Sequence, residues 1–194
     1  ETNAQTLLSG KFMTDFETYS LDQFPLRDSF RTLKAVTSFY ALGKKDNNGI
    51  YLSNGYAAKL EYPLDENSVT SAAKKFAALY DTYIKDNGGK VYLAVAPDKG
   101  YFLAEKNGYP ALDYEKMLSL LQENMPFAEY VDLFSPLSLE DYYKTDTHWR
   151  QERIIDASRV LAAAMGGRGI GDYTIEKANV PFYGVYYGQS ALPL

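Results

Sequence analysis

Residues 91–96 (Val-Tyr-Leu-Ala-Val-Ala) constrain the fold of this chain more than any other segment. This short run is almost continuously apolar, which is the pattern of a strand covered on both faces of a sheet. A second short strand is predicted over residues 130–134, and a helix over residues 66–85 precedes the first. The inward stripe of that helix follows a three- and four-residue spacing, with Val69, Ala73, Phe76, Tyr80 and Ile84. Strands that alternate with helices predict an α/β domain with a mainly parallel sheet and helices on its faces.

The remaining elements are predicted from caps and turn residues. A helix is expected over residues 25–42, and a hairpin over residues 50–62 turns at Asn54-Gly55, which accept positive φ. Asp113 is placed to cap a third helix, and a fourth is expected over residues 154–165. We treat residues 1–194 as a single domain with an amino-terminal helical segment, 1–45. The aromatic tail, 172–194, is punctuated by glycine and lacks helical spacing, which favours a strand or hairpin there.

Composition excludes several classes of function. The net charge is −5 and no run of basic residues stands out, so nucleic acid is not an expected partner. The absence of cysteine excludes disulfides, thiolate metal sites and a cysteine nucleophile. One histidine and no calcium-loop spacing lead us to expect no metal and no cofactor. The 18 Tyr and 10 Phe residues suit surfaces that meet sugars or proteins, and equally suit half-buried strand and helix positions.

Asp146 and His148 are the strongest candidates for chemistry, because His148 is the only histidine. In an extended segment, residues two apart share a face, so the carboxylate can reach the ring. A carboxylate on Nδ1–H orients an imidazole and stabilises the imidazolium that forms when Nε2 accepts a proton. The alternative is a structural or merely exposed histidine. Trp149 either walls a pocket or anchors the next helix, and Asp98 and Lys99 either line a pocket at a strand end or form an ion pair in a turn.

Residues 142–152 (Tyr-Tyr-Lys-Thr-Asp-Thr-His-Trp-Arg-Gln-Glu) resemble the signature block of the DHHW family. Thr147 stands at the second signature position, as in the related alginate O-acetyltransferases. Residues 24–28, 48–52 and 96–99 also agree with that family in order and spacing. The resemblance therefore spans nearly the whole chain, and the Asp-x-His-Trp block is its most specific part.

The resemblance implies a three-layer SGNH-hydrolase-like fold on an exported or cell-surface protein. Its relatives transfer or remove acetyl groups on extracellular polysaccharide. In that family Asp146 would orient His148, and His148 would act as general base toward a serine that follows later in a Gly-Asp-Ser block. No such block occurs in this sequence, and Ser190 lacks its context. We therefore expect the domain to be incomplete at its carboxyl terminus and the 194 residues alone to lack esterase activity.

Two functions remain open at this point. The first is action on acyl (acetyl) esters of cell-wall or secreted polysaccharide, with Asp146 and His148 as orienter and base and with Trp149 and Lys99 contacting substrate. The second is a non-catalytic extracellular module on the same scaffold that binds carbohydrate or protein. A reading frame that continues past Leu194 into a Gly-Asp-Ser block favours the enzyme, and a stop codon there favours the module. Sheet edges that lack partners would also favour self-association.

Overall fold

A small parallel sheet lies at the centre of a mixed α/β fold. The computed structural model describes residues 9–169, 171, 173–176 and 178–192. Within them, strand β4 (Val91–Val95) pairs in parallel with β5 (Ala128–Asp132), from Val91↔Ala128 to Val95↔Asp132. The connection between the two strands contains helix α6 (Tyr114–Asn124), as a parallel crossover requires. The predicted parallel pairing is confirmed for these two strands.

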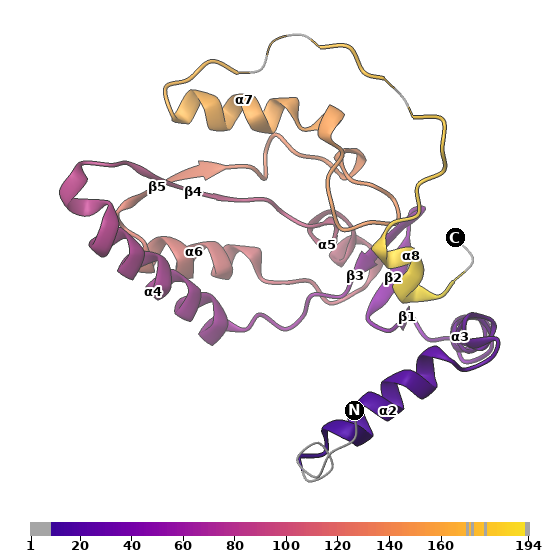
Figure 1. Cartoon of the computed structure of the whole chain (residues 1–194). Helices are drawn as coiled ribbons and strands as arrows, with labels where there is room; N and C mark the ends of the chain where they lie inside the picture. The colour runs from indigo at the N-terminus through magenta and orange to yellow at the C-terminus, as the bar shows by residue number, and fades with distance from the viewer. Residues whose placement is uncertain (1–8, 170, 172, 177, 193–194) are drawn as a thin grey trace.

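Helices lie on both sides of this strand pair, as Figure 1 shows: α4 (Glu66–Tyr83) and α6 on one side, and α7 (Ile155–Ala164) on the other. Side chains cap the first two helices. Asp113 accepts a hydrogen bond from the Lys116 N–H at 2.8 Å, and Asp65 accepts one from the Ser68 N–H at 2.9 Å. These helices and the Asp113 cap agree with the sequence prediction, because capping is decided within one turn of chain.

The strand pair is less buried than the sequence predicted. Ala94 is exposed and the rest of β4 is only half-buried, so the expectation of a strand covered on both faces is wrong. The cause lies in the helix positions, since α7 packs on β5 more than on β4. In the part of the chain that the structure describes, neither strand has a further partner. The predicted self-association stays a prediction.

A second sheet is antiparallel and contains β1 (Asp46–Asn47), β2 (Ile50–Ser53) and β3 (Tyr56–Lys59). Its hairpin turns at Asn54 and Gly55, with φ of 51° and 77°, as predicted. The buried side of the sheet packs on α5 (Lys99–Leu103), and Tyr51 stacks on Tyr109 with ring centroids 4.0 Å apart. This packing places the amino end of α5 beside the hairpin.

The amino-terminal helices stand partly apart from this body. Helix α3 (Arg27–Val36) continues into a π-helical turn, η1 (Thr37–Ala41), and matches the helix predicted over 25–42. Helix α2 (Lys11–Asp22) lies within the predicted amino-terminal helical segment, 1–45, although its bounds were not predicted. It buries none of its residues, and Figure 1 shows it projecting from the body. The short 3₁₀ helices are η2 (Lys85–Asn87), η3 (Glu105–Asn107), η4 (Leu139–Asp141) and η5 (Gln151–Arg153).

The aromatic tail contains a helix, α8 (Val185–Ser190), so the expected strand or hairpin is wrong there. Tyr186 explains the difference: its buried ring packs with Ile50 and Ala57, and this contact docks α8 on the β2–β3 hairpin. Positions 172, 177, 193 and 194 of the tail lie outside the described residues. Among the helices that are described, none has the length and apolar character needed to cross a bilayer.

Candidate functional site

The segment that carries the candidate pair is a closed loop. Tyr142 and Trp149 form an isolated antiparallel bridge, and the Tyr143 N–H donates to the His148 carbonyl at 3.1 Å. The Tyr142 hydroxyl donates to the carbonyl of Pro97, two residues after the end of β4. Residues 142–144 therefore form one bridge and the start of a turn. The loop follows η4 and lies near the carboxyl end of β4, where sites gather in parallel sheets.

Asp146 and His148 contact each other. Asp146 Oδ1 lies 2.5 Å from His148 Nδ1 and also accepts the His148 backbone N–H at 3.0 Å. The carboxylate thus accepts a hydrogen bond from the backbone N–H of the residue two positions later, as Asp side chains do in turns. Residues 146–148 form a bend. The predicted proximity is correct, but the predicted cause, an extended segment with a shared face, is wrong.

The second carboxylate oxygen is held from another part of the chain. Asp146 Oδ2 accepts the Val185 N–H at 2.9 Å. On either side of this bond, Gly184 N–H donates to Thr145 Oγ1 at 3.1 Å, and Tyr186 N–H donates to the Thr145 carbonyl at 3.0 Å. The first turn of α8 therefore lies directly on the residues that carry the carboxylate.

These bonds set the charge of Asp146, which is 7% exposed. Burial acts to raise its pKa, but the hydrogen bonds from the His148 and Val185 N–H groups and from the His148 ring outweigh it and hold the pKa below its ordinary value. An ionised carboxylate can only accept hydrogen bonds, so the proton between the two groups is assigned to Nδ1. The His148 side chain is 76% exposed, which leaves Nε2 as the nitrogen available for proton transfer.

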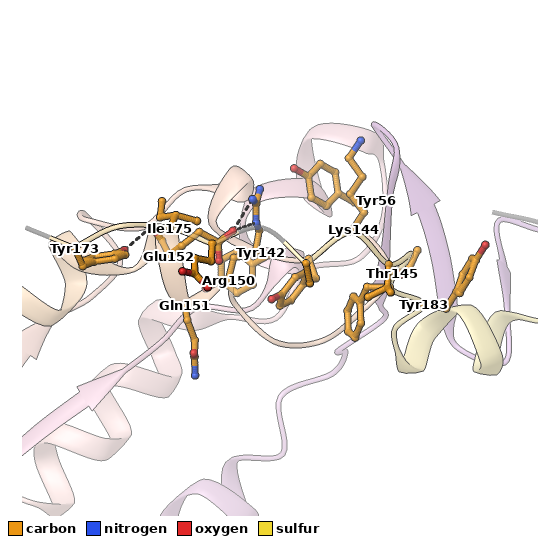
Figure 2. A pocket seen from close by; sticks show the side chains of 15 residues that line it. Tyr56, Tyr142, Lys144, Thr145, Arg150, Gln151, Glu152, Tyr173, Ile175 and Tyr183 are labelled. Carbon is orange, nitrogen blue, oxygen red and sulfur yellow. Dashed lines mark hydrogen bonds and ion pairs between the residues drawn. The ribbon is translucent and has the colours of Figure 1, made fainter.

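A cleft of about 940 Å³ adjoins the loop (Figure 2). Lys144 and Thr145 line it, whereas Asp146 and His148 do not, so it reaches the loop just before the pair. Arg150 and Glu152 form an ion pair of 2.6 Å in its wall. The aromatic residues of the lining are Tyr56, Tyr142, Tyr143, Tyr173, Phe182 and Tyr183. The cleft therefore offers flat apolar faces beside a few polar groups.

Lys99 neither lines the cleft nor forms the ion pair with Asp98 that the sequence suggested. Its ammonium donates to the carbonyls of Ala57, Tyr143 and Lys144, the last two at 3.0 and 3.1 Å. The residue is 3% exposed and does not line the cleft, so it has almost no surface to offer a substrate. An ion pair with Asp98 is also wrong, because Asp98 caps α5 and accepts the Tyr114 hydroxyl at 2.6 Å. Burial lowers the pKa of Lys99 to about 8, against the opposing charges of Asp146 and Asp98.

Trp149 and Ser190 both have structural surroundings. Trp149 packs against the cluster of Leu133, Leu137 and Ala157, which includes a residue of α7, and it does not line the cleft. Ser190 is fully buried: its hydroxyl donates to the Tyr187 carbonyl at 3.2 Å and accepts the Leu192 N–H at 3.3 Å. These contacts agree with the expectation that Ser190 is not a nucleophile.

Sequence analysis missed the residues that fix α8 over the loop. Three side chains hold the carbonyls at the end of this helix: Arg31 bonds Gly188 at 2.8 Å, Asn48 bonds Gln189 at 2.9 Å and Asn47 bonds Ser190 at 2.8 Å. At the other end, Gly184 and Val185 meet Thr145 and Asp146. No spacing rule connects these positions, which are 39 to 157 residues apart, and the only local signal was the presence of glycine in the tail.

Comparisons with family models, with curated proteins and with solved structures give no match for this chain. Within the described residues, no group of three or more Asp, Glu or His side chains is arranged to hold a metal ion. The expectation of a site without metal or cofactor stays a prediction. The geometry of the Asp146–His148 pair is therefore the main basis for assigning a function.

Proposed function

We propose that this chain supplies the orienter and general base of an SGNH-like acyl-transfer protein that acts on acetyl esters of extracellular polysaccharide. One observation carries the proposal: an ionised, buried carboxylate bonds Nδ1 of an exposed imidazole at 2.5 Å. The resemblance of residues 142–152 to the DHHW signature supports it, because Asp146 and His148, which are in contact, are the residues that the resemblance assigns as orienter and base. A three-layer SGNH-like fold on an exported protein belongs to the same proposal.

In the proposed reaction, His148 Nε2 takes the proton from a serine hydroxyl as the serine oxygen attacks the ester carbonyl carbon. Asp146 stabilises the imidazolium, which then gives its proton to the sugar oxygen that leaves. The acetyl group remains on the serine until water or another sugar hydroxyl attacks it, again with His148 as base. Residues outside these 194 supply the serine, since the late serine of this chain, Ser190, is enclosed.

The cleft is the proposed path of the glycan. Pockets of roughly 300–1,000 Å³ hold small ligands, and a cleft of about 940 Å³ has room for more than one sugar ring. Tyrosine and phenylalanine faces suit the apolar C–H faces of sugars, and Tyr hydroxyls can bond sugar hydroxyls. Lys144 and Thr145 line the cleft, so a glycan bound there would contact the two residues that precede Asp146 in the sequence.

The second candidate is a glycan-binding module without catalysis. The position of the pair just outside the aromatic lining favours it, since the cleft can bind a chain without using His148. Equilibrium binding of a neutral oligosaccharide to the 194-residue chain, with and without Tyr183→Ala, examines this candidate. A cleft that binds glycan equally well after His148→Ala, in a natural protein without esterase activity, would establish the module.

The enzyme proposal is tested with the natural full-length protein and p-nitrophenyl acetate as probe. Asp146→Asn and His148→Ala should each lower kcat/KM by about 10³–10⁴, because the base loses its orienter or is removed. Glu140→Gln, an exposed carboxylate before the same loop, is the matched control and should retain the rate. An unchanged rate in either site variant would remove these residues from the mechanism. The 194-residue chain alone should show no measurable hydrolysis.

A further inference from the structure

The backbone of Gly184 comes closer to Asp146 than any other amino acid at position 184 would allow. A Cβ placed on Gly184 would overlap the Asp146 Cβ and the Thr145 carbonyl oxygen, and it would lie 2.6 Å from the Asp146 Cα. Each of these neighbours belongs to the backbone or lies next to it, so none can move aside as the end of a long side chain can. Gly184 is itself buried.

This close approach brings two N–H groups to the loop. Gly184 N–H reaches Thr145 Oγ1 at 3.1 Å, and the next N–H, that of Val185, reaches Asp146 Oδ2 at 2.9 Å. The second bond fixes the carboxylate oxygen that does not touch His148. With Oδ2 held, rotation of the carboxylate is restricted, and Oδ1 stays directed at the imidazole.

We infer that Gly184 is a positioning residue for the Asp146–His148 pair, acting through the N–H group of Val185. Its requirement is steric, since φ of −81° and ψ of 176° are accessible to every amino acid. The inference rests on the proposed function only for its effect on catalysis. The geometry of the pair can be measured without any catalysis.

A control glycine lies in the helix that follows Gly184. Gly188 is three residues after the start of α8, and a Cβ on it would meet nothing within 4 Å. Gly184→Ala, at the N-cap of α8, and Gly188→Ala, inside the helix, make the same chemical change, and only the methyl group at position 184 meets neighbouring atoms. A general effect of alanine on α8 would appear in both variants.

The readout is the tautomer of His148, which is the only histidine in the sequence and gives one set of ring signals. In the ¹⁵N-labelled chain, long-range ¹H–¹⁵N correlations at a pH where the ring is neutral identify the protonated nitrogen. We expect the Nδ1–H form in the parent chain and in Gly188→Ala, because an acceptor on Nδ1 selects it. Gly184→Ala should move the population toward the Nε2–H form, because Oδ1 is then no longer held against Nδ1.

A second variant removes the donor without adding bulk at position 184. Val185→Pro deletes the N–H group at the first position of α8, where proline is well tolerated, and the extended backbone of Gly184 suits a residue before proline. It should shift the tautomer in the same direction as Gly184→Ala. Circular dichroism and a thermal melt establish that each variant is folded before its tautomer is compared.

The outcomes separate this inference from the proposed function. A folded Gly184→Ala or Val185→Pro with the parent tautomer overturns the positioning role. A shifted tautomer, together with a loss of kcat/KM on the order of 100-fold in the full-length Gly184→Ala protein, supports both ideas. A shifted tautomer with an unchanged rate supports the positioning role and contradicts the catalytic proposal.

Discussion

The β4–β5 layer and the loop that carries Asp146 are built in different ways. In the layer, α4, α6 and α7 cover two strands, and the side-chain caps of α4 and α6 are made within three residues of chain. In the loop, the carboxylate is fixed by backbone groups from residue 185, and the preceding carbonyls are fixed by Lys99. The layer thus depends on apolar area, whereas the loop depends on a few polar contacts that join distant segments. Variants can test whether the two parts respond separately.

The largest effect is expected in the layer. Leu133→Ala removes a side chain that is 3% exposed and packs with Leu137 and Ala157, so it should lower the free energy of unfolding by about 2–5 kcal/mol. Trp149 packs against the same cluster, but the His148 tautomer should remain that of the parent chain, because the bonds that hold Asp146 come from Val185 and from its own loop. Urea unfolding and ¹⁵N spectra measure the two properties. A tautomer that changes together with stability would contradict the separation.

A smaller effect, with a distinct pH dependence, is expected at Lys99. Its pKa is about 8 in the folded chain and ordinary, 10.5, when unfolded, so between these values the unfolded chain binds more protons. The contribution of Lys99 to stability therefore rises with pH in that window. The free energy of unfolding of the parent minus that of Lys99→Met should increase by on the order of 1–3 kcal/mol between pH 7 and pH 10.

Denaturant titrations at several pH values measure this difference, and groups that titrate in both proteins cancel from it. Lys90→Met, which removes an exposed lysine, is the matched control for the lost positive charge. If the free energy of unfolding of the parent minus that of Lys99→Met stays constant or falls with pH, the pKa of Lys99 is not lowered by burial in the folded chain. Because Lys99 bonds the carbonyls of Tyr143 and Lys144, the variant should also broaden the His148 ring signals.

The smallest effect is expected at a helix cap of the layer. Asp113→Ala removes the acceptor for the Lys116 N–H and should cost about 1 kcal/mol, whereas Asp113→Asn should retain most of the stability. Urea unfolding resolves the two variants. Equal losses in both would indicate that the charge of Asp113, and not its capping bond, stabilises α6.

These differences explain which features the sequence could predict. The turn at Asn54-Gly55 and the Asp113 cap were predicted because their causes are local. The Asp146–His148 contact was predicted as well, although through the wrong backbone conformation. The closeness of Gly184 to Asp146 could not be predicted, because the two positions are far apart in the chain and the glycine has no unusual φ. Helix α8 was missed since its stability comes from one buried tyrosine and from distant side chains on its carbonyls.

The bond from Arg31 to the carbonyl of Gly188 has a practical consequence for anyone who shortens this protein. The amino-terminal helices look dispensable, because α2 has no buried residue and α3 lies at the periphery (Figure 1). Deleting both would nevertheless remove the guanidinium that steadies the far end of α8, whose near end touches Asp146. A truncation intended only to aid crystallisation would then disturb the imidazole from the opposite end of the sequence.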